Sequence, residues 1–102
     1  HMESNLDKFN LLRKIGSKPN SSQRQLASEL GFSLGKLNYC LKSLKDKGFV
    51  KISNFQKNPN KIGYVYILTP KGISVKTKLT ISFMKRKMKE YDELKSEIEA
   101  NK

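Results

Sequence analysis

Cysteine and histidine are nearly absent from this chain, and with them most of the side chains that metal sites and disulfides need. The only cysteine among the 102 residues is Cys40, and the only histidine is His1. A single thiol cannot form an internal disulfide, which favours a reducing compartment and hence the cytoplasm. His1 and Met2 look like a cloning remnant and carry no weight in the fold prediction.

Other signatures of catalysis and of membrane insertion are missing as well. The predicted domain has no pair of carboxylates, no glycine-rich phosphate loop and no nucleophile elbow, so we expect no enzyme, no metal ion and no cofactor. No stretch of about 18 apolar residues exists and no signal peptide is visible, so neither a transmembrane helix nor a membrane partner is expected. The hydrophobic share of 36% is low, which predicts one domain with an appendage that stands away from its core.

Acidic residues are also scarce, and the positive charge that remains is regional. The chain has 21 Lys and Arg against 9 Asp and Glu, a net charge of +12. Residues 47–89 include 11 basic residues and no acidic one, whereas residues 90–102 include five acidic and two basic ones. This balance points to a polyanionic partner, nucleic acid first and an anionic membrane surface second, although a generally lysine-rich composition would also give a basic surface.

Apolar spacing and capping signals predict three helices in the first half of the chain. The first covers residues 3–15, capped by Ser4 or Asn5 and ended by Gly16. The second starts near Ser22, in capping-box spacing with Gln25, and the third starts at residue 33. Gly31 and Gly48 are expected to end the second and third helices. The predicted inner faces are Leu6, Phe9, Leu12 and Ile15; Leu26, Ala27 and Leu30; and Leu37, Leu41 and Leu44.

Two strands and one long helix are predicted in the second half. The strands cover residues 49–53, with Val50 and Ile52 on one face, and residues 64–68; they flank a turn-rich loop of the kind called a wing. Thr69 and Pro70 begin a helix that can continue to about residue 100. The fold class is therefore mainly α with a small β-hairpin: a winged helix-turn-helix over residues 3–68 and a coiled-coil-like dimerisation helix over residues 69–102.

The outward face of the third predicted helix has the composition of a DNA-reading surface. A helix-turn-helix places the N-terminal half of its second helix in the major groove. Lys36 can donate to guanine and Asn38 can pair with adenine, while Gly35 permits close approach to base edges. An ordinary solvated polar face is the alternative.

Phosphate contacts are predicted beside that helix. Free N–H groups after Ser22, together with Arg24, favour an anion, and Lys57 and Lys61 in the wing loop can follow a DNA backbone. Simple helix capping and an ordinary solvated turn are the alternatives. The predicted DNA contacts are Ser22, Arg24, Ser33, Gly35, Lys36, Asn38, Tyr39, Lys42, Lys57 and Lys61.

Apolar residues in the last predicted helix recur every three or four positions, as in a short coiled-coil seam. They are Ile81, Met84, Met88, Tyr91, Leu94 and Ile98. A homodimer seam is the preferred interpretation and a ligand-binding stripe the alternative. An antiparallel pair crossing at Tyr91 would place the basic residues 85–89 opposite the acidic residues 93–97 of the partner, but parallel pairing stays open.

Cys40 lies near the inner edge of the third predicted helix, and two interpretations remain open. A small buried thiol is the preferred one. A redox sensor is the alternative, since Lys36, one helical turn away, could lower the pKa of the thiol.

Several segments together resemble the MarR-type winged-helix regulators, and among them the small subgroup of exopolysaccharide-associated transcriptional regulators. They are residues 22–27 (SQRQLA), 33–41 (SLGKLNYCL), 47–48 (KG), 68–72 (LTPKG) and 83–88 (FMKRKM). The resemblance implies a bacterial, dimeric regulator of double-stranded DNA, with repression as the expected direction. Larger MarR proteins have further C-terminal helices that build an effector pocket. This chain ends after one helix, so no small-molecule effector is expected. A non-specific nucleoid or RNA-binding protein and a protein-interaction adaptor are the alternative functions.

Overall fold

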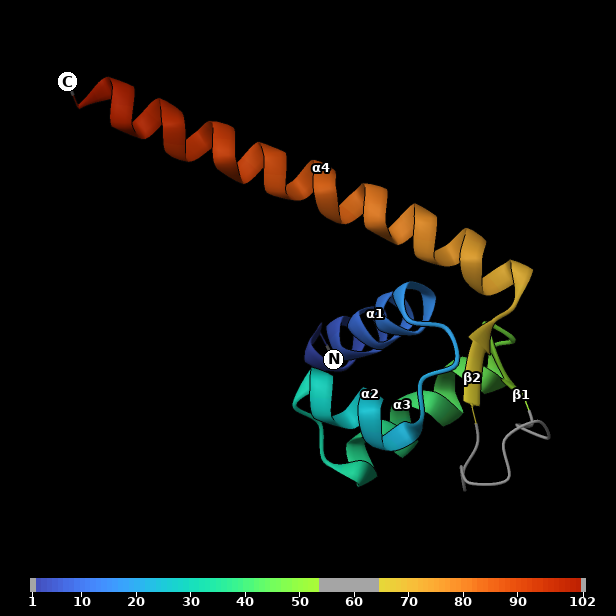
Figure 1. The fold of residues 1–102 in the computed structure, drawn as a ribbon. Helices are drawn as coiled ribbons and strands as arrows, with labels where there is room; N and C mark the ends of the chain where they lie inside the picture. Colours follow the sequence, from blue (N-terminus) through green and yellow to red (C-terminus); the bar gives the residue numbers. More distant parts are fainter. Residues whose placement is uncertain (1, 54–64, 102) are drawn as a thin grey trace.

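The computed structural model describes residues 2–53 and 65–101, with side chains for residues 5–52 and 65–101. Its elements follow the predicted order and confirm a mainly α winged helix-turn-helix with a long last helix. In Figure 1, α1, α2, α3 and the hairpin form one body, and α4 runs along α1 before extending past it. The elements are α1 (Met2–Ser17), α2 (Gln23–Leu30), α3 (Leu34–Asp46), β1 (Val50–Ser53), β2 (Val65–Leu68) and α4 (Pro70–Ala100).

One apolar core joins the three small helices to the hairpin. Burial of this surface is the main force that holds such short elements together. The largest fully buried side chains come from all three helices, and Val50 and Tyr66 add the two strands. The buried cluster is Leu11, Leu12, Ile15, Leu26, Ala27, Leu37, Cys40, Leu41, Leu44, Val50 and Tyr66.

The first helix differs from its prediction at both ends. It already begins at Met2, so the predicted capping positions Ser4 and Asn5 lie inside it, and it continues through Gly16 to Ser17. The N–H of Lys18 still donates to the carbonyl of Lys14, so Gly16 does not end the helix. The reversal comes at Asn20, whose φ of 71° is left-handed, a conformation that asparagine tolerates.

The predicted inner face of α1 is also partly wrong. Leu6 is 47% exposed, whereas Leu11, which the spacing did not single out, is fully buried. Phe9 and Ile15 are buried as predicted. The helix is covered by α3 on one side and by α4 on another, so its buried face is wider than one stripe of i, i+3 positions.

The caps of α2 and α3 confirm the helix-turn-helix signals. The Ser22 hydroxyl accepts from the Gln25 N–H, and the Gln25 side chain accepts from the Ser22 N–H at 3.0 Å. Gly31 ends α2 with φ 69°, and Gly48 follows α3 with φ 78°. Both are conformations that glycine adopts without steric cost, which explains the two sharp turns.

The hairpin is antiparallel, with Val50 opposite Leu68 and Ile52 opposite Tyr66. The first strand begins one residue later than predicted, at Val50, and the second is described from Val65. Val50 is buried but Ile52 is 37% exposed, so these two residues are not equally covered. The predicted wing loop, including Lys57 and Lys61, lies outside the described residues, as does Tyr64 of the predicted second strand.

The last helix is anchored to the body by its first turns and then leaves it. Thr69 caps α4 by accepting from the Gly72 N–H, and its hydroxyl donates to the Gly48 carbonyl at 2.6 Å. Farther along, the rings of Phe9 and Phe83 lie 5.8 Å apart. Every described residue from Met84 onward is exposed, so nothing in the described part of the chain buries a side chain of this half of α4.

Candidate nucleic-acid interface

The outward face of α3 is centred on three of the predicted DNA contacts. Successive residues of an α-helix are turned by about 100°, so Gly35, Tyr39 and Lys42 lie opposite the buried Leu37 and Leu44. Tyr39 is 62% exposed, and Lys42 is also exposed. A Cβ added to Gly35 would meet no atom within 4 Å. Nothing described in this chain therefore requires a glycine there.

Lys36 lies on the flank of this face that is turned toward α1. Its Nζ is 2.9 Å from Oδ2 of Asp7 and 4.6 Å from the centroid of the Phe32 ring. On the same flank, Nζ of Lys8 lies 5.3 Å from the centroid of the Tyr39 ring. The N-terminal half of α1 therefore contacts Lys36 and Tyr39, two of the side chains predicted to contact DNA.

Asn38 lies on the other flank, where α2 and the hairpin meet α3. The Gln23 amide donates to Oδ1 of Asn38 at 2.6 Å and to the hydroxyl of Tyr66 at 3.1 Å. Sequence reasoning missed Gln23, which is separated from these partners by 15 and 43 residues. Its place directly after the Ser22 cap was the only signal, and it does not reveal these partners.

The two predicted serine contacts are helix caps in this structure. Ser22 caps α2, and the hydroxyl of Ser33 accepts from the Lys36 N–H at 3.1 Å. Both hydroxyls therefore cap helices here, which is the alternative given above for Ser22. Arg24 is exposed in the first turn of α2, beside the Ser22 cap. The Arg24 cation thus lies beside the N-terminus of α2, an arrangement that favours the binding of an anion.

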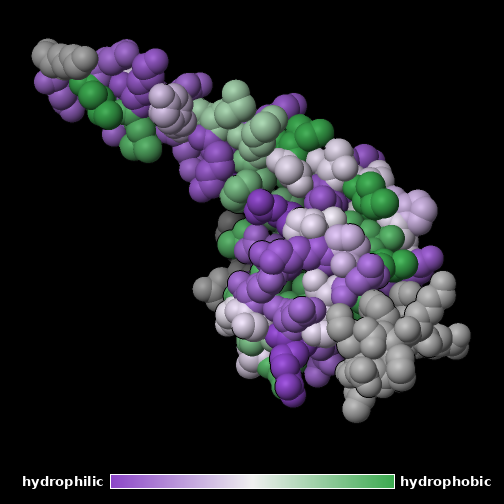
Figure 2. All heavy atoms as spheres, viewed as in Figure 1, coloured by the Kyte–Doolittle hydropathy of each residue, from purple (hydrophilic) through white to green (hydrophobic). Residues whose placement is uncertain are grey.

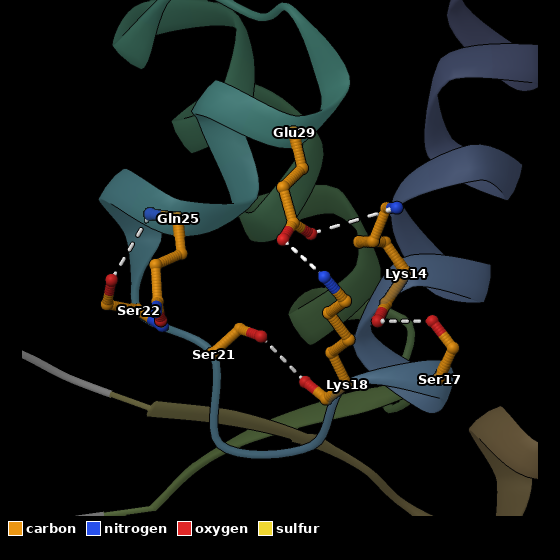
Figure 3. A network of polar contacts seen from close by, with 7 residues as sticks. All are labelled: Lys14, Ser17, Lys18, Ser21, Ser22, Gln25 and Glu29. Atoms are coloured by element: carbon orange, nitrogen blue, oxygen red, sulfur yellow. Dashed lines mark hydrogen bonds and ion pairs between the residues drawn. The ribbon is translucent and has the colours of Figure 1, made fainter.

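A polar network holds α2 against the end of α1 (Figure 3). Nζ of Lys18 is 2.6 Å from Oε1 of Glu29, and Nζ of Lys14 is 3.7 Å from Oε2. The hydrogen bond from Lys18 is the main reason that the pKa of Glu29 is lowered, and the charges of both lysines add to it. The Ser21 hydroxyl donates to the Lys18 carbonyl at 2.7 Å, which fixes the connection between the two helices.

Cys40 is 1% exposed and packs in the core. Burial raises the pKa of its thiol, and the charge of Asp7 acts in the same direction, against the smaller effects of Lys8 and Lys36. A thiol with a raised pKa is a poor nucleophile at neutral pH. The structure therefore favours the buried-thiol interpretation over the redox sensor.

The six predicted dimerisation residues are all exposed in the single chain. Figure 2 shows hydrophobic patches spaced along α4, while hydrophilic side chains cover much of the body in that view. Such a row of exposed large apolar residues is unusual on a monomer and is typical of an interaction surface. The exposed fractions are 45% for Ile81, 51% for Met84, 58% for Met88, 65% for Tyr91, 59% for Leu94 and 65% for Ile98.

A hollow of about 660 Å³ opens between α1 and α4. Phe9, Leu12 and Phe83 contribute to its apolar wall, and Lys8 and Arg86 are among the cations that line it. The expectation that the chain has no small-molecule effector rested on its single C-terminal helix. The hollow between α1 and α4 gives that expectation no support.

Two features are missing from the part of the chain that the structure describes: a metal-binding cluster and a helix that could cross a membrane. There, no three acidic, cysteine or histidine side chains come close enough to hold a metal ion. Nor does any helix in residues 2–53 and 65–101 combine the length and apolar character that a membrane crossing demands.

Residues 8–51 match the family model described as winged helix-turn-helix DNA-binding. No curated protein sequence matches the chain. Similar solved structures include Streptococcus pneumoniae FabT in complex with DNA, at 23% identity over 81% of this chain and 56% of that one, with a TM-score of 0.66. Staphylococcus aureus MarR in complex with salicylate and kanamycin is 16% identical over 79% of this chain and 53% of that one, with a TM-score of 0.68.

A Lactococcus lactis ZitR mutant in apo form matches over 94% of this chain and 70% of that one, at 19% identity and a TM-score of 0.72. The chain spans little more than half the length of the FabT and MarR chains. At these identities the likeness shows the fold, and that fold is the one the sequence predicted.

Proposed function

We propose that this chain, a winged helix-turn-helix protein with the fold of the MarR-type regulators, is a sequence-specific regulator of transcription that binds double-stranded DNA as a homodimer in the cytoplasm. The observation that carries the proposal is the outward face of α3. It presents Gly35, Tyr39 and Lys42 to solvent, with Lys36 and Asn38 on its flanks. The FabT structure, which contains DNA, supports the same use of the fold.

The roles within this surface follow from chemistry and position. Lys36 and Asn38 carry the donors and acceptors that distinguish base edges in the major groove. Lys42 and Arg24 contact phosphates, which position the protein without reading sequence. Two recognition helices of a dimer address half-sites about 34 Å apart, so the operator is an inverted repeat. A dimer bound there acts as a repressor.

The dimer forms through the exposed apolar seam of α4. We infer antiparallel pairing from charge, because the basic residues 85–89 then lie opposite the acidic residues 93–97 of the partner. Parallel pairing would mostly align like charges. With the crossing at Tyr91, a Tyr91→Cys variant forms a disulfide-linked dimer under mild oxidation, whereas an unlinked product would show that the crossing point is elsewhere.

The test of the function is a selection from a randomised duplex pool at about 150 mM salt. We expect an inverted repeat that binds at least about 10³-fold more tightly than a scrambled duplex. If the pool stays random and affinity collapses as salt rises, the charge binds only backbone and the chain is a nucleoid-type protein. Weak binding at every salt concentration would instead indicate an adaptor. The resemblance to exopolysaccharide-associated regulators stays a prediction, which the genes beside the selected operator would test.

A further inference from the structure

Gln23 joins three elements of the fold at the edge of the proposed DNA surface. It is the first residue of α2, and its amide nitrogen lies within hydrogen-bond distance of Asn38 on α3 and Tyr66 on β2. The backbone supports the same junction, because Ser22 pairs with Val65 in an isolated antiparallel bridge. This bridge joins the residues next to Gln23 and Tyr66, so the main chain itself brings these two side chains together.

The two partners of Gln23 differ in how firmly they are held. Tyr66 is 6% exposed and belongs to the buried core, so its ring cannot move without disturbing that core. Asn38 is exposed on the outer part of α3, and within the described residues its side chain makes only this hydrogen bond. An exposed asparagine samples several side-chain conformations unless a neighbour selects one. Because the Gln23 amide is held by the buried Tyr66, its hydrogen bond to Asn38 favours one conformation of the Asn38 side chain.

We propose that Gln23, held by Tyr66, is a positioning residue that orients Asn38 for reading a base pair. This inference rests on the proposed function. A side chain that must meet a base edge in one geometry loses less entropy on binding when that geometry already exists in the free protein. Gln23 therefore increases the preference for the correct base pair without adding to the phosphate contacts that hold every sequence.

The experiment compares the selected operator, the same duplex changed at single base pairs, and a scrambled duplex. We expect Gln23→Ala to reduce the preference for the base pair read by Asn38 by about fivefold, the effect of one hydrogen bond. Its affinity for the scrambled duplex stays that of the unaltered protein. Ser28→Ala, at an exposed position of α2, serves as the matched control and changes neither value.

A double-variant cycle separates positioning from a direct contact by Gln23. Once Asn38→Ala has removed the reading side chain, Gln23→Ala should cause no further loss of preference. Additive losses would overturn the inference, because they would mean that Gln23 contacts DNA independently. Tyr66→Phe removes only the hydroxyl and keeps the buried ring, and we expect it to lower the same preference in the same direction.

The outcomes distinguish this inference from the proposed function. If the unaltered protein prefers its operator and Gln23→Ala keeps the full preference, the positioning role is wrong while the function stands. An equal loss on operator and scrambled duplex would show only damage to the fold and would also overturn it. If the unaltered protein shows no preference for any duplex, the proposed function fails, and the inference fails with it.

Discussion

Lys36 on α3 and Asp7 on α1 form an ion pair, with 2.9 Å between Nζ and Oδ2. If Lys36 contacts DNA as proposed, this carboxylate competes with DNA for the cation. We expect Asp7→Asn to raise affinity for every duplex by about two- to fivefold, because the substitution removes a negative charge beside the proposed DNA surface. The folded state should be little affected, since a partly exposed ion pair contributes little to stability. Fluorescence anisotropy at several salt concentrations measures this, and the gain should shrink as salt rises. A weaker complex would mean that Asp7 orients Lys36 for DNA.

Gly35→Ala should change stability and DNA affinity in opposite directions. The added Cβ meets nothing within 4 Å in the chain, so the helix gains up to about 1 kcal/mol from the better helix former. If α3 enters the major groove closely at this point, the methyl group meets DNA and binding weakens. Thermal unfolding and anisotropy measure the two effects. Unchanged DNA affinity in a stabilised variant would place the closest approach elsewhere on the helix.

Gly72→Ala tests how α4 is attached to the body. A Cβ at this position would overlap the Phe49 carbonyl oxygen and lie 2.8 Å from the carbonyl carbon. The same oxygen accepts from the Thr69 N–H at 3.0 Å, so it cannot retreat without losing that bond. We expect a loss of about 1–3 kcal/mol in the free energy of unfolding, the usual effect of overpacking. Denaturant unfolding measures it, with Gly35→Ala as the matched glycine control; an unaffected midpoint would show that this junction yields easily.

The contact between Glu29 and Lys18 predicts a pH dependence of stability. A carboxyl group whose pKa is lowered by folding stabilises the folded state above its unfolded pKa, and this contribution is lost as pH falls through the folded pKa. We expect the unaltered protein to be more stable than Glu29→Gln at neutral pH. The difference should shrink as pH falls below about 4.3, the ordinary pKa of glutamate, and on through the lower pKa of Glu29 in the folded protein. Unfolding midpoints of both proteins across this range measure it. A difference independent of pH would mean that the ion pair does not contribute.

Met88→Glu should dissociate the proposed dimer. Met88 is 58% exposed in the single chain and lies in the middle of the seam, so the substitution places a charge at the interface without disturbing the folded body. Sedimentation equilibrium measures the mass, and circular dichroism checks that the helix content of the body is kept. Ser96→Glu adds the same charge off the seam and should stay dimeric. If both variants had the mass of a dimer, the interface would lie on another face of the molecule.

Much of the fold could be predicted because its signals are local. The Ser22–Gln25 capping box, the left-handed turns at Gly31 and Gly48, and Thr69 with Pro70 depend only on neighbours a few residues away. Each fixes the backbone wherever it occurs, so the order of helices and strands was predictable. The first helix was less so, because a longer hydrogen-bonded run continued past Gly16 and the turn came at Asn20.

The candidate site was predictable as a face but not as a set of contacts. Helical spacing alone places Gly35, Tyr39 and Lys42 on the outside of α3, since it requires only the buried positions of the same helix. That Lys36 meets Asp7, and Asn38 meets Gln23, depends on how α1 and α2 cross α3. The packing of side chains over the whole core sets how these helices cross, and the residue spacing within a single helix does not predict it.

By itself, the sequence determined the order of the helices, the caps of α2, α3 and α4, the basic character of residues 47–89 and the apolar seam of the last helix. These follow from short-range hydrogen bonding, periodicity and charge, which act along the chain. Only the tertiary structure decided that Tyr66, in the core, is linked through Gln23 to the exposed Asn38 of α3. Contacts between residues far apart in sequence form only when the core closes, because burial of apolar surface, rather than any local signal, brings those elements together.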